Sequence, residues 1–200
     1  MTEKISGVIL AGGLGRRMGG VDKGLQLLDG RPMVGWVIER LAPQIDELRI
    51  NTNQNRAAYE SFGYPVFADD VPDFAGPLAG LHAALQRASH PLVVTAPCDS
   101  PFLPDDLVVR LYAGLTEKGA DLAVARTFEQ VHPVFCLCRR ELLAGLADYL
   151  AGGGRRVDRW HSSLNVAIVS FDDEAEAFRN INTADELADS RSRPFRQRDE

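Results

Sequence analysis

A glycine-rich stretch that carries three basic side chains occupies residues 10–24 and reads "LAGGLGRRMGGVDKG". Glycine lets the backbone turn sharply and approach a ligand closely. Backbone N–H groups, the guanidiniums of Arg16 and Arg17 and the ammonium of Lys23 all favour anions. Cations spread along one loop suit an extended triphosphate, so the stretch predicts a phosphate-binding loop. The alternative is a solvated turn with incidental charges.

Two common phosphate-binding loops do not match this stretch. The Walker A loop needs a Gly-Lys pair followed by Ser or Thr, and the chain contains no Gly-Lys pair. The dinucleotide fingerprint needs glycine at its sixth place, and counting from Gly13 and Gly15 that place is Met18. A ribose-binding acidic residue is also missing after the second predicted strand, where Asn51 and Asn53 stand instead.

A single carboxylate, Asp99, follows the apolar run "LVVTAP". A carboxylate at the exit of a buried strand is well placed for Mg²⁺, which prefers hard oxygen ligands and keeps several waters. The alternative role is an N-cap for the helix expected after Pro104. Asp69 either binds a nucleotide or shares the metal, and Asp70 is a candidate for capping a turn.

These residues need a scaffold that brings strand ends together, and the alternation of apolar runs and helical patterns supplies one. The order favours an α/β fold around a mainly parallel sheet. Ligands in such sheets gather beyond the carboxyl ends of strands, where Gly12, Asn51, Asp69 and Asp99 are expected. The predicted strands are 5–10, 47–52, 65–68, 92–96, 122–125, 134–138 and 164–171, and the predicted helices 33–41, 56–62, 78–87, 105–118, 139–150 and 183–189.

Composition limits the class of protein. The chain has 200 residues, of which 45% are hydrophobic, which fits one domain, placed at 1–189, with a polar tail at 190–200. A net charge of −6 argues against a nucleic-acid partner, and no apolar run has the length of a membrane span. Three cysteines indicate a reducing compartment, and Cys136 and Cys138 are expected to be buried thiols rather than part of a zinc site.

The glycine-rich stretch resembles the signature LAGG-x-x-x-R-M-G-x(n)-K of a group of nucleotidyltransferases, and within that group the molybdenum cofactor guanylyltransferases, a MobA-type family. "GPLAG" (76–80), "PCDSPFL" (97–103) and "NINTADEL" (180–187) match as well, so the resemblance runs from about residue 5 to residue 189. Gly15 departs from the Ser or Ala that the family often has, and "GGVDK" is one residue longer. The resemblance implies a Rossmann-like three-layer α/β/α nucleotidyltransferase fold.

The reaction that the resemblance implies is attack of a molybdopterin phosphate oxygen on the α-phosphate of GTP, with pyrophosphate leaving and Mg²⁺ as cofactor. Arg17, Lys23 and Asp99 are the expected catalytic residues, and Asp99 the expected metal ligand. Lys23 has an alternative as a surface partner of Asp22 or Asp29. The expected nucleotide-binding residues are Leu10, Ala11, Gly12, Gly13, Gly15, Lys23, Asn51, Asp69 and Asp99.

Guanine would pair with backbone groups of 10–12 and with the Asn51 amide. Related cytidylyltransferases tend to carry LAAG, and the extra glycine of LAGG gives room for a purine. Gly76 and Gly80 are expected near the ribose or the acceptor. Asn180 and Asn182 either bind the pterin end or serve turn and cap chemistry before Thr183. His132 is expected to be structural, and Arg155 and Arg156 either bind a pterin phosphate or are solvated.

The expected partners are GTP, molybdenum-molybdopterin and other molybdenum cofactor biosynthesis proteins, with no nucleic acid and no membrane. A cytoplasmic monomer is expected. Two alternatives stand beside guanylyl transfer: a cytidylyl or sugar-phosphate nucleotidyltransferase, and a nucleotide-binding domain without catalysis.

Overall fold

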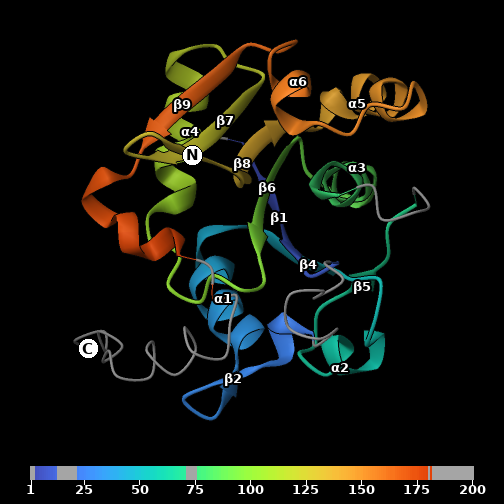
Figure 1. Cartoon of the computed structure of the whole chain (residues 1–200), viewed down its shortest axis with the longest axis vertical. Helices are drawn as coiled ribbons and strands as arrows, with labels where there is room; N and C mark the ends of the chain where they lie inside the picture. Colours follow the sequence, from blue (N-terminus) through green and yellow to red (C-terminus); the bar gives the residue numbers. More distant parts are fainter. Residues whose placement is uncertain (1–2, 13–21, 71–75, 180, 182–200) are drawn as a thin grey trace.

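The computed structural model describes residues 3–12, 22–70, 76–179 and 181, and contains a seven-stranded sheet between two layers of helices (Figure 1). The strand order is β5-β4-β1-β6-β8-β7-β9. The strands are β1 (Ile5–Leu10), β4 (Glu47–Asn51), β5 (Val66–Phe67), β6 (Leu92–Pro97), β7 (Leu122–Thr127), β8 (Gln130–Arg139) and β9 (Val166–Ser170).

The α-helices are α1 (Met33–Leu41), α2 (Arg56–Glu60), α3 (Pro77–Arg87), α4 (Leu107–Glu117), α5 (Leu143–Ala151) and α6 (Val157–His161). The 3₁₀ helices are η2 (Lys23–Leu25), η3 (Ala42–Gln44), η4 (Arg140–Leu142) and η5 (Asp172–Phe178). A small hairpin joins β2 (Leu27–Leu28) to β3 (Arg31–Pro32).

The sheet is mainly parallel, as predicted. β8 runs antiparallel to both of its neighbours, β6 and β7, while the other described pairings are parallel. Every residue of β6 is buried, which is typical of a central strand covered on both faces.

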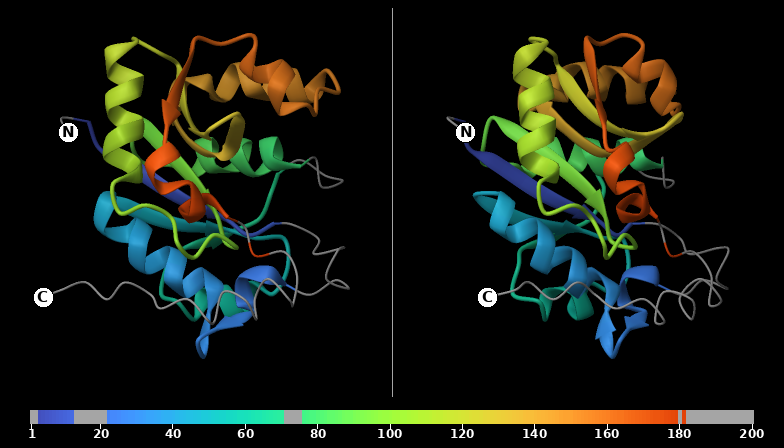
Figure 2. Two further views of the ribbon diagram at one scale, coloured as in Figure 1. Left: turned by 60° about the vertical axis from the view of Figure 1, so that its left-hand side comes forward. Right: turned by 90° about the vertical axis from the view of Figure 1, so that its left-hand side faces the viewer.

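Helices cover both faces and divide the core in two. α1 and α4 pack on one face with side chains such as Val37 and Leu111, around Ile9 of β1. α3, α5 and α6 cover the other face (Figure 2). Their side chains, such as Leu81 and Trp160, belong to the second core cluster. The three-layer α/β/α expectation is confirmed.

Several boundaries differ from the sequence prediction. α4 begins at Leu107 rather than at 105, because Asp106 has non-helical dihedral angles and is the N-cap. Arg139 belongs to β8, and the helix expected from 139 starts as a 3₁₀ turn before α5. The sequence did not predict the β2–β3 hairpin, α6 or η5. The helix expected at 183–189 and the tail at 190–200 lie outside the described residues.

The register of the sheet places the ends of four strands at one edge. Leu10 pairs with Asn51 and with Pro97, and Asn51 pairs with Phe67. The backbone pairing continues one residue beyond the end of β6, because the N–H of Cys98 donates to the Leu10 carbonyl at 3.1 Å. Two positions after each of the paired residues 10, 51, 67 and 97 stand Gly12, Asn53, Asp69 and Asp99.

Two compositional expectations also have structural counterparts. Cys98, Cys136 and Cys138 are free thiols and buried, as predicted for the last two. Among the described residues, no helix has both the length and the apolarity needed to cross a membrane.

Candidate active site

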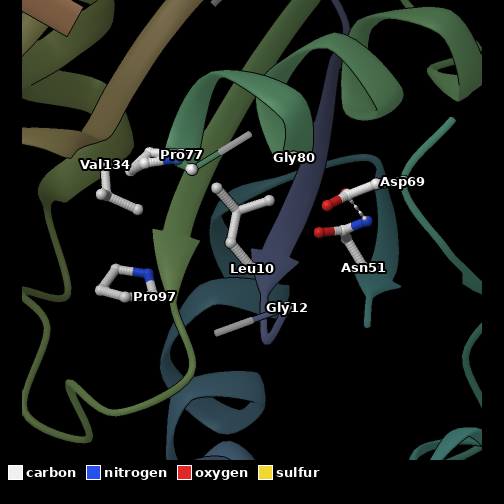
Figure 3. Close-up of a pocket in the computed structure, with 9 residues that line it drawn as sticks. Leu10, Gly12, Asn51, Asp69, Pro77, Gly80, Pro97 and Val134 are labelled. Atoms are coloured by element: carbon white, nitrogen blue, oxygen red, sulfur yellow. Dashed lines mark hydrogen bonds between the residues drawn. The ribbon is translucent and has the colours of Figure 1, made fainter. Parts of the chain in front are cut away.

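A pocket of about 180 Å³ lies at the carboxyl ends of β1, β4 and β6 (Figure 3). Sites for drug-sized ligands are usually about 300–1,000 Å³, so this pocket has room for one part of such a ligand, such as a single ring system. Six of the lining residues are ones that the sequence singled out, and they come from four elements and their loops. The lining consists of Leu10, Gly12, Asn51, Asp69, Gly76, Pro77, Gly80, Pro97 and Val134.

Glycine leaves room for neighbouring side chains at two places in this wall, where a Cβ would press against them. A Cβ at Gly12 would lie 3.0 Å from Asn53 Nδ2, and a Cβ at Gly80 would lie 3.1 Å from Asn51 Oδ1. Gly76 has φ +75°, a conformation that other residues rarely adopt, and it precedes Pro77 at the first position of α3. The backbone therefore forms part of the pocket surface.

Two asparagines hold the carboxylate of Asp69. Asn51 Nδ2 donates to Oδ1 at 2.9 Å, Asn53 Nδ2 donates to Oδ2 at 2.8 Å, and the Asp69 N–H donates back to Asn53 Oδ1 at 2.9 Å. This network fixes the amide orientation of Asn51, with its oxygen on the side of Gly80 and the pocket (Figure 3). The pocket wall thus presents fixed oxygen acceptors.

Lys23 and Asp99 form a second cluster beyond the pocket. Lys23 Nζ lies 3.1 Å from Asp99 Oδ2, and the two side chains are 22% and 11% exposed. The alternative reading of Asp99 as the cap of α4 is wrong, because Asp106 occupies that position. Lys23 forms its ion pair with Asp99, whereas the Asp22 carboxylate accepts hydrogen bonds from other groups.

The Asp99 carboxylate fits a magnesium ion that takes most of its other ligands from water and substrate phosphates rather than from the protein. The described residues contain no group of three His, Cys, Asp or Glu side chains arranged to hold a metal. Mg²⁺ is usually bound by one or two carboxylates together with waters and substrate phosphates, so one partly buried carboxylate suffices. Asp69 has both oxygens engaged by amides, which favours its nucleotide-binding alternative over metal sharing.

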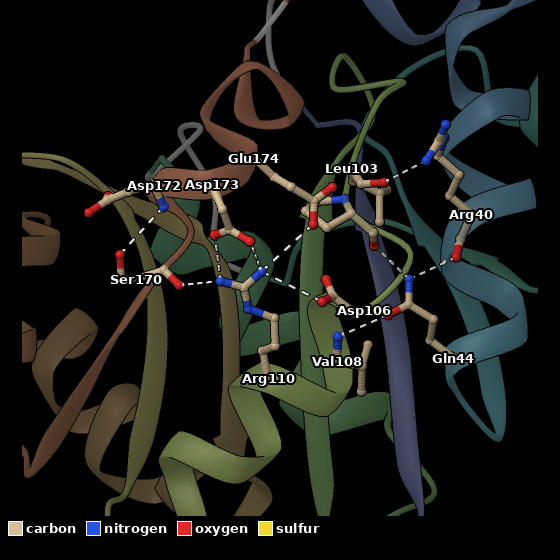
Figure 4. A network of polar contacts seen from close by, with 11 residues as sticks. Arg40, Gln44, Leu103, Asp106, Val108, Arg110, Ser170, Asp172, Asp173 and Glu174 are labelled. Atoms are coloured by element: carbon tan, nitrogen blue, oxygen red, sulfur yellow. Dashed lines mark hydrogen bonds and ion pairs between the residues drawn. The ribbon is translucent and has the colours of Figure 1, made fainter. Parts of the chain in front are cut away.

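The loop that carries Asp99 is held by hydrogen bonds from α1 and η3 (Figure 4). Gln44, at the end of η3, donates from Nε2 to the Pro104 carbonyl at 2.9 Å and accepts the Val108 N–H at 2.9 Å. Arg40 of α1 donates to the Leu103 carbonyl at 3.2 Å. These contacts join the loop between β6 and α4 to the α1 layer.

The Asp99 backbone has a further partner. The N–H of Ile181 donates to the Asp99 carbonyl at 3.0 Å, and the buried Ile181 side chain packs with Leu28 and Met33. The chain around Ile181 therefore returns to the Lys23–Asp99 pair.

Some predicted residues lie outside the part of the chain that the structure describes. They are Gly13, Gly15, Arg17, Asn180 and Asn182. Ala11 is described and buried, and its N–H donates to the Asn51 carbonyl at 2.7 Å.

Other polar residues have structural partners. Asp70 pairs with Arg87, and hydrogen bonds from Arg87 lower the pKa of Asp70, while the turn that Asp70 was expected to cap lies outside the described residues. His132 Nε2 lies 2.7 Å from Thr127 Oγ1, and burial lowers the pKa of His132. Exposed Arg156 pairs with Asp158.

The sequence placed Asn53 beside Asn51 at a strand exit but gave it no role, and it missed two residues near the site, Asn55 and Tyr59. Asn55 and Tyr59, which bind Asp22, lie in a polar segment whose pattern does not distinguish them from surface residues.

Comparisons with known proteins agree with this geometry. Residues 7–165 match the family model of the MobA-like NTP transferase domain. The molybdenum cofactor guanylyltransferase of Cupriavidus necator is 56% identical over 190 residues, covering 92% of this chain and 95% of the relative. The relative from Ralstonia nicotianae, which has the same name, is 52% identical over 195 residues, covering 93% and 95%.

A solved structure extends the similarity to three dimensions. Molybdopterin-guanine dinucleotide biosynthesis protein A from Archaeoglobus fulgidus has a TM-score of 0.76 at 25% identity, over 94% of this chain and 97% of its own. Because this family model matches most of the chain, the protein belongs to the MobA-like NTP transferase family.

Proposed function

We propose that this protein transfers GMP from GTP to the terminal phosphate of molybdenum-molybdopterin, which forms the guanine dinucleotide cofactor and releases pyrophosphate. Its relatives are molybdenum cofactor guanylyltransferases and a molybdopterin-guanine dinucleotide biosynthesis protein, which supports guanylyl transfer over the cytidylyl and sugar-phosphate alternatives. The geometric observation that carries the proposal is a base-sized pocket with fixed acceptors next to a lysine–carboxylate pair.

Recognition of the base is assigned to the wall that Asn51 and Asp69 form. Guanine presents two adjacent donors, N1–H and N2–H₂, and this wall presents oxygens that are held in place by hydrogen bonds. The edges of adenine and cytosine each carry one amino donor beside a ring nitrogen acceptor, so these bases fit a protein wall of two acceptors less well than guanine does. The nucleotide-binding roles of Leu10, Ala11, Gly12 and the Asn51–Asp69 wall are part of this proposal.

The phosphate end is assigned to Lys23 and Asp99, together with Arg17 and the backbone of Gly13 and Gly15 on sequence grounds. Lys23 would compensate the charge that develops on the α-phosphate and the leaving pyrophosphate. Asp99 would hold Mg²⁺, which supplies further charge compensation when bound. The acceptor phosphate is already ionised at neutral pH, so the protein needs no general base and no covalent intermediate.

The remaining assignments are further from the reacting atoms. Gly76 and Gly80 would border the ribose or the acceptor, and Asn180 and Asn182 the pterin. We also propose that residues 1–189 form one domain followed by a polar tail, and that the protein is a cytoplasmic monomer. Three free buried thiols support the reducing location.

Titration of the protein with GTP, ITP, ATP and CTP in the presence of Mg²⁺ tests the base assignment. GTP should bind tightest. ITP lacks the 2-amino group, so its affinity should fall by about tenfold, which corresponds to one lost hydrogen bond of about 1.5 kcal/mol. Tighter binding of CTP than of GTP would overturn the guanylyl assignment, and equal binding of GTP and ITP would overturn the role of the acceptor wall.

A further inference from the structure

Lys23 follows a residue that is anchored inside the protein. Asp22 is only 8% exposed, and its carboxylate accepts a hydrogen bond from the Tyr59 hydroxyl at 2.6 Å and another from Asn55 Nδ2 at 2.9 Å. Tyr59 belongs to α2, and Asn55 is the N-cap of that helix. We refer to Asp22, Asn55 and Tyr59 together as the Asp22 anchor.

Tyr59 is suited to be a permanent donor in this anchor. Its side chain is fully buried. Burial, together with the neighbouring Cys98 and Asp22, raises the pKa of Tyr59, so the phenol stays protonated at neutral pH. A neutral hydroxyl donating to a carboxylate is a charge-assisted hydrogen bond, one of the stronger kinds in proteins.

The anchor also contacts the segment that carries Asp99. A Cβ at Gly24 would lie 2.5 Å from the Tyr59 hydroxyl oxygen and 3.0 Å from Cys98 Sγ, so the Gly24 backbone packs directly against both residues. Cys98 immediately precedes Asp99. Tyr59 therefore touches the chain on both sides of Lys23 and lies next to the segment that leads to the partner of Lys23.

The backbone of Asn55 is set for this contact. It has φ +52° and ψ 32°, the left-handed conformation that asparagine tolerates better than most residues. Its carbonyl accepts the Ala58 N–H at 2.9 Å, which ties the residue to the first turn of α2. α2 thus supplies two donors, from Asn55 and Tyr59, to one carboxylate.

We propose that Tyr59 and Asn55 are positioning residues that act through Asp22 to place the Lys23 ammonium beside Asp99 and the nucleotide phosphates. This inference rests on the proposed role of Lys23 in GMP transfer. Small displacements of a group that stabilises a transition state cost large factors in rate, because the alignment of the reacting atoms is lost. The anchor restrains the backbone on the amino-terminal side of Lys23, which limits such displacements.

A double-mutant cycle between Tyr59→Phe and Lys23→Ala tests this coupling. The four proteins are compared by kcat for GMP transfer, KM for GTP and Tm. Tyr59→Phe removes one hydroxyl and keeps the ring, so we expect kcat to fall by about tenfold when Lys23 is present. In the Lys23→Ala background the same change should alter kcat by less than about twofold, because the group to be positioned is gone.

Tyr149→Phe is the matched control. It removes another tyrosine hydroxyl that donates a hydrogen bond, here to the Arg156 main-chain carbonyl at 2.9 Å, and Tyr149 neither lines the pocket nor contacts the Lys23–Asp99 pair. It should leave kcat unchanged in both backgrounds. If Tyr59→Phe folds poorly, Asn55→Gly takes its place in the cycle, since glycine keeps the left-handed backbone while removing the amide.

The outcomes separate this inference from the proposed function. A Tyr59→Phe effect of equal size in both backgrounds would overturn the inference, because it would show an action independent of Lys23. A slow Lys23→Ala protein with a fully active Tyr59→Phe protein would overturn the inference alone. Wild-type turnover in Lys23→Ala would instead overturn the proposed role of Lys23 in the reaction.

Discussion

At the residue scale, Asp99 is held through its main chain and its side chain at once. Its carbonyl accepts a hydrogen bond from the Ile181 N–H at 3.0 Å, and its carboxylate accepts one from the Lys23 ammonium at 3.1 Å. A partly buried carboxylate without a partner would be costly, so the pair keeps both charges compensated. The same two charges are those that a complex of Mg²⁺ and a triphosphate requires, since the carboxylate suits the metal and the ammonium suits the phosphates.

Asp99→Asn should separate chemistry from stability. The side chain keeps its size but loses its charge, so activity should fall by about 100-fold or more, as when one group that stabilises a transition state is removed. The free energy of unfolding should change by no more than about 1 kcal/mol, because asparagine can still accept the Lys23 hydrogen bond. The rate as a function of Mg²⁺ concentration and the Tm are measured on the same sample.

Asp105→Asn provides the comparison within the same loop. Its carboxylate is 59% exposed and pairs with Arg40 at 3.3 Å, so the substitution should leave the Mg²⁺ dependence as it is. An Asp99→Asn protein that is destabilised yet fully active would contradict the metal-ligand role.

At the scale of elements, one carboxylate links β4 to β1 and to the segment before β6 at the end of the sheet opposite the site. Glu47, the first residue of β4, accepts hydrogen bonds from Ser6 Oγ in β1 at 2.6 Å and from the N–H of Ser89 before β6 at 3.1 Å. Arg49 donates to it as well. Burial opposes ionisation, but these hydrogen bonds outweigh burial and lower the pKa of Glu47 to about 2.

Glu47→Gln should therefore lower stability in a pH-dependent way. The pKa of Glu47 in the folded state lies below its ordinary value of 4.5, so the ionised form stabilises the fold above pH 4.5. That contribution is lost as the pH falls from about 4.5 to about 2. Urea unfolding should give a wild-type advantage of about 1–2 kcal/mol at pH 7, which shrinks across that window.

Glu60→Gln is the control for this experiment, since Glu60 forms an exposed i,i+4 pair with Arg56. Its effect on the free energy of unfolding should stay within about 0.5 kcal/mol. A difference between wild type and Glu47→Gln that is equally large at pH 7 and pH 2.5 would refute the electrostatic explanation.

Prediction of the elements succeeded where apolar runs have clear ends. β1 stops at a glycine segment and α1 starts after Pro32, and both matched the predicted ranges. The direction of β8 was not predicted, because the strand was expected to begin at Val134. It begins at Gln130, with only two residues between it and the end of β7 at Thr127, and so short a connection makes the pair antiparallel.

Two short elements escaped prediction for a different reason. The strands of the β2–β3 hairpin have two residues each, and α6 has five. Segments of this length contain less than two full periods of a hydrophobic pattern, so periodicity carries little information about them.

At the scale of the whole molecule, the proposed base end and phosphate end of the site are built from different strand exits. The rule that ligands gather at the carboxyl ends of strands predicted the pocket residues from β1, β4 and β5 and the position of Asp99 after β6. It did not predict which side chains pair. The hydrogen bonds of Asn53 to Asp69 and of Tyr59 to Asp22 depend on how loops from separate strands meet, which local sequence does not encode.

The most direct test of guanylyl transfer follows the individual phosphates of GTP. The protein is incubated with Mg²⁺, molybdenum-molybdopterin and GTP labelled either at the α- or at the γ-phosphate. The account predicts that the α label enters the pterin product and the γ label leaves as pyrophosphate, in equal amounts, and that CTP gives far less product. Transfer of the γ label to the pterin, release of GDP and phosphate, or faster transfer from CTP would contradict it.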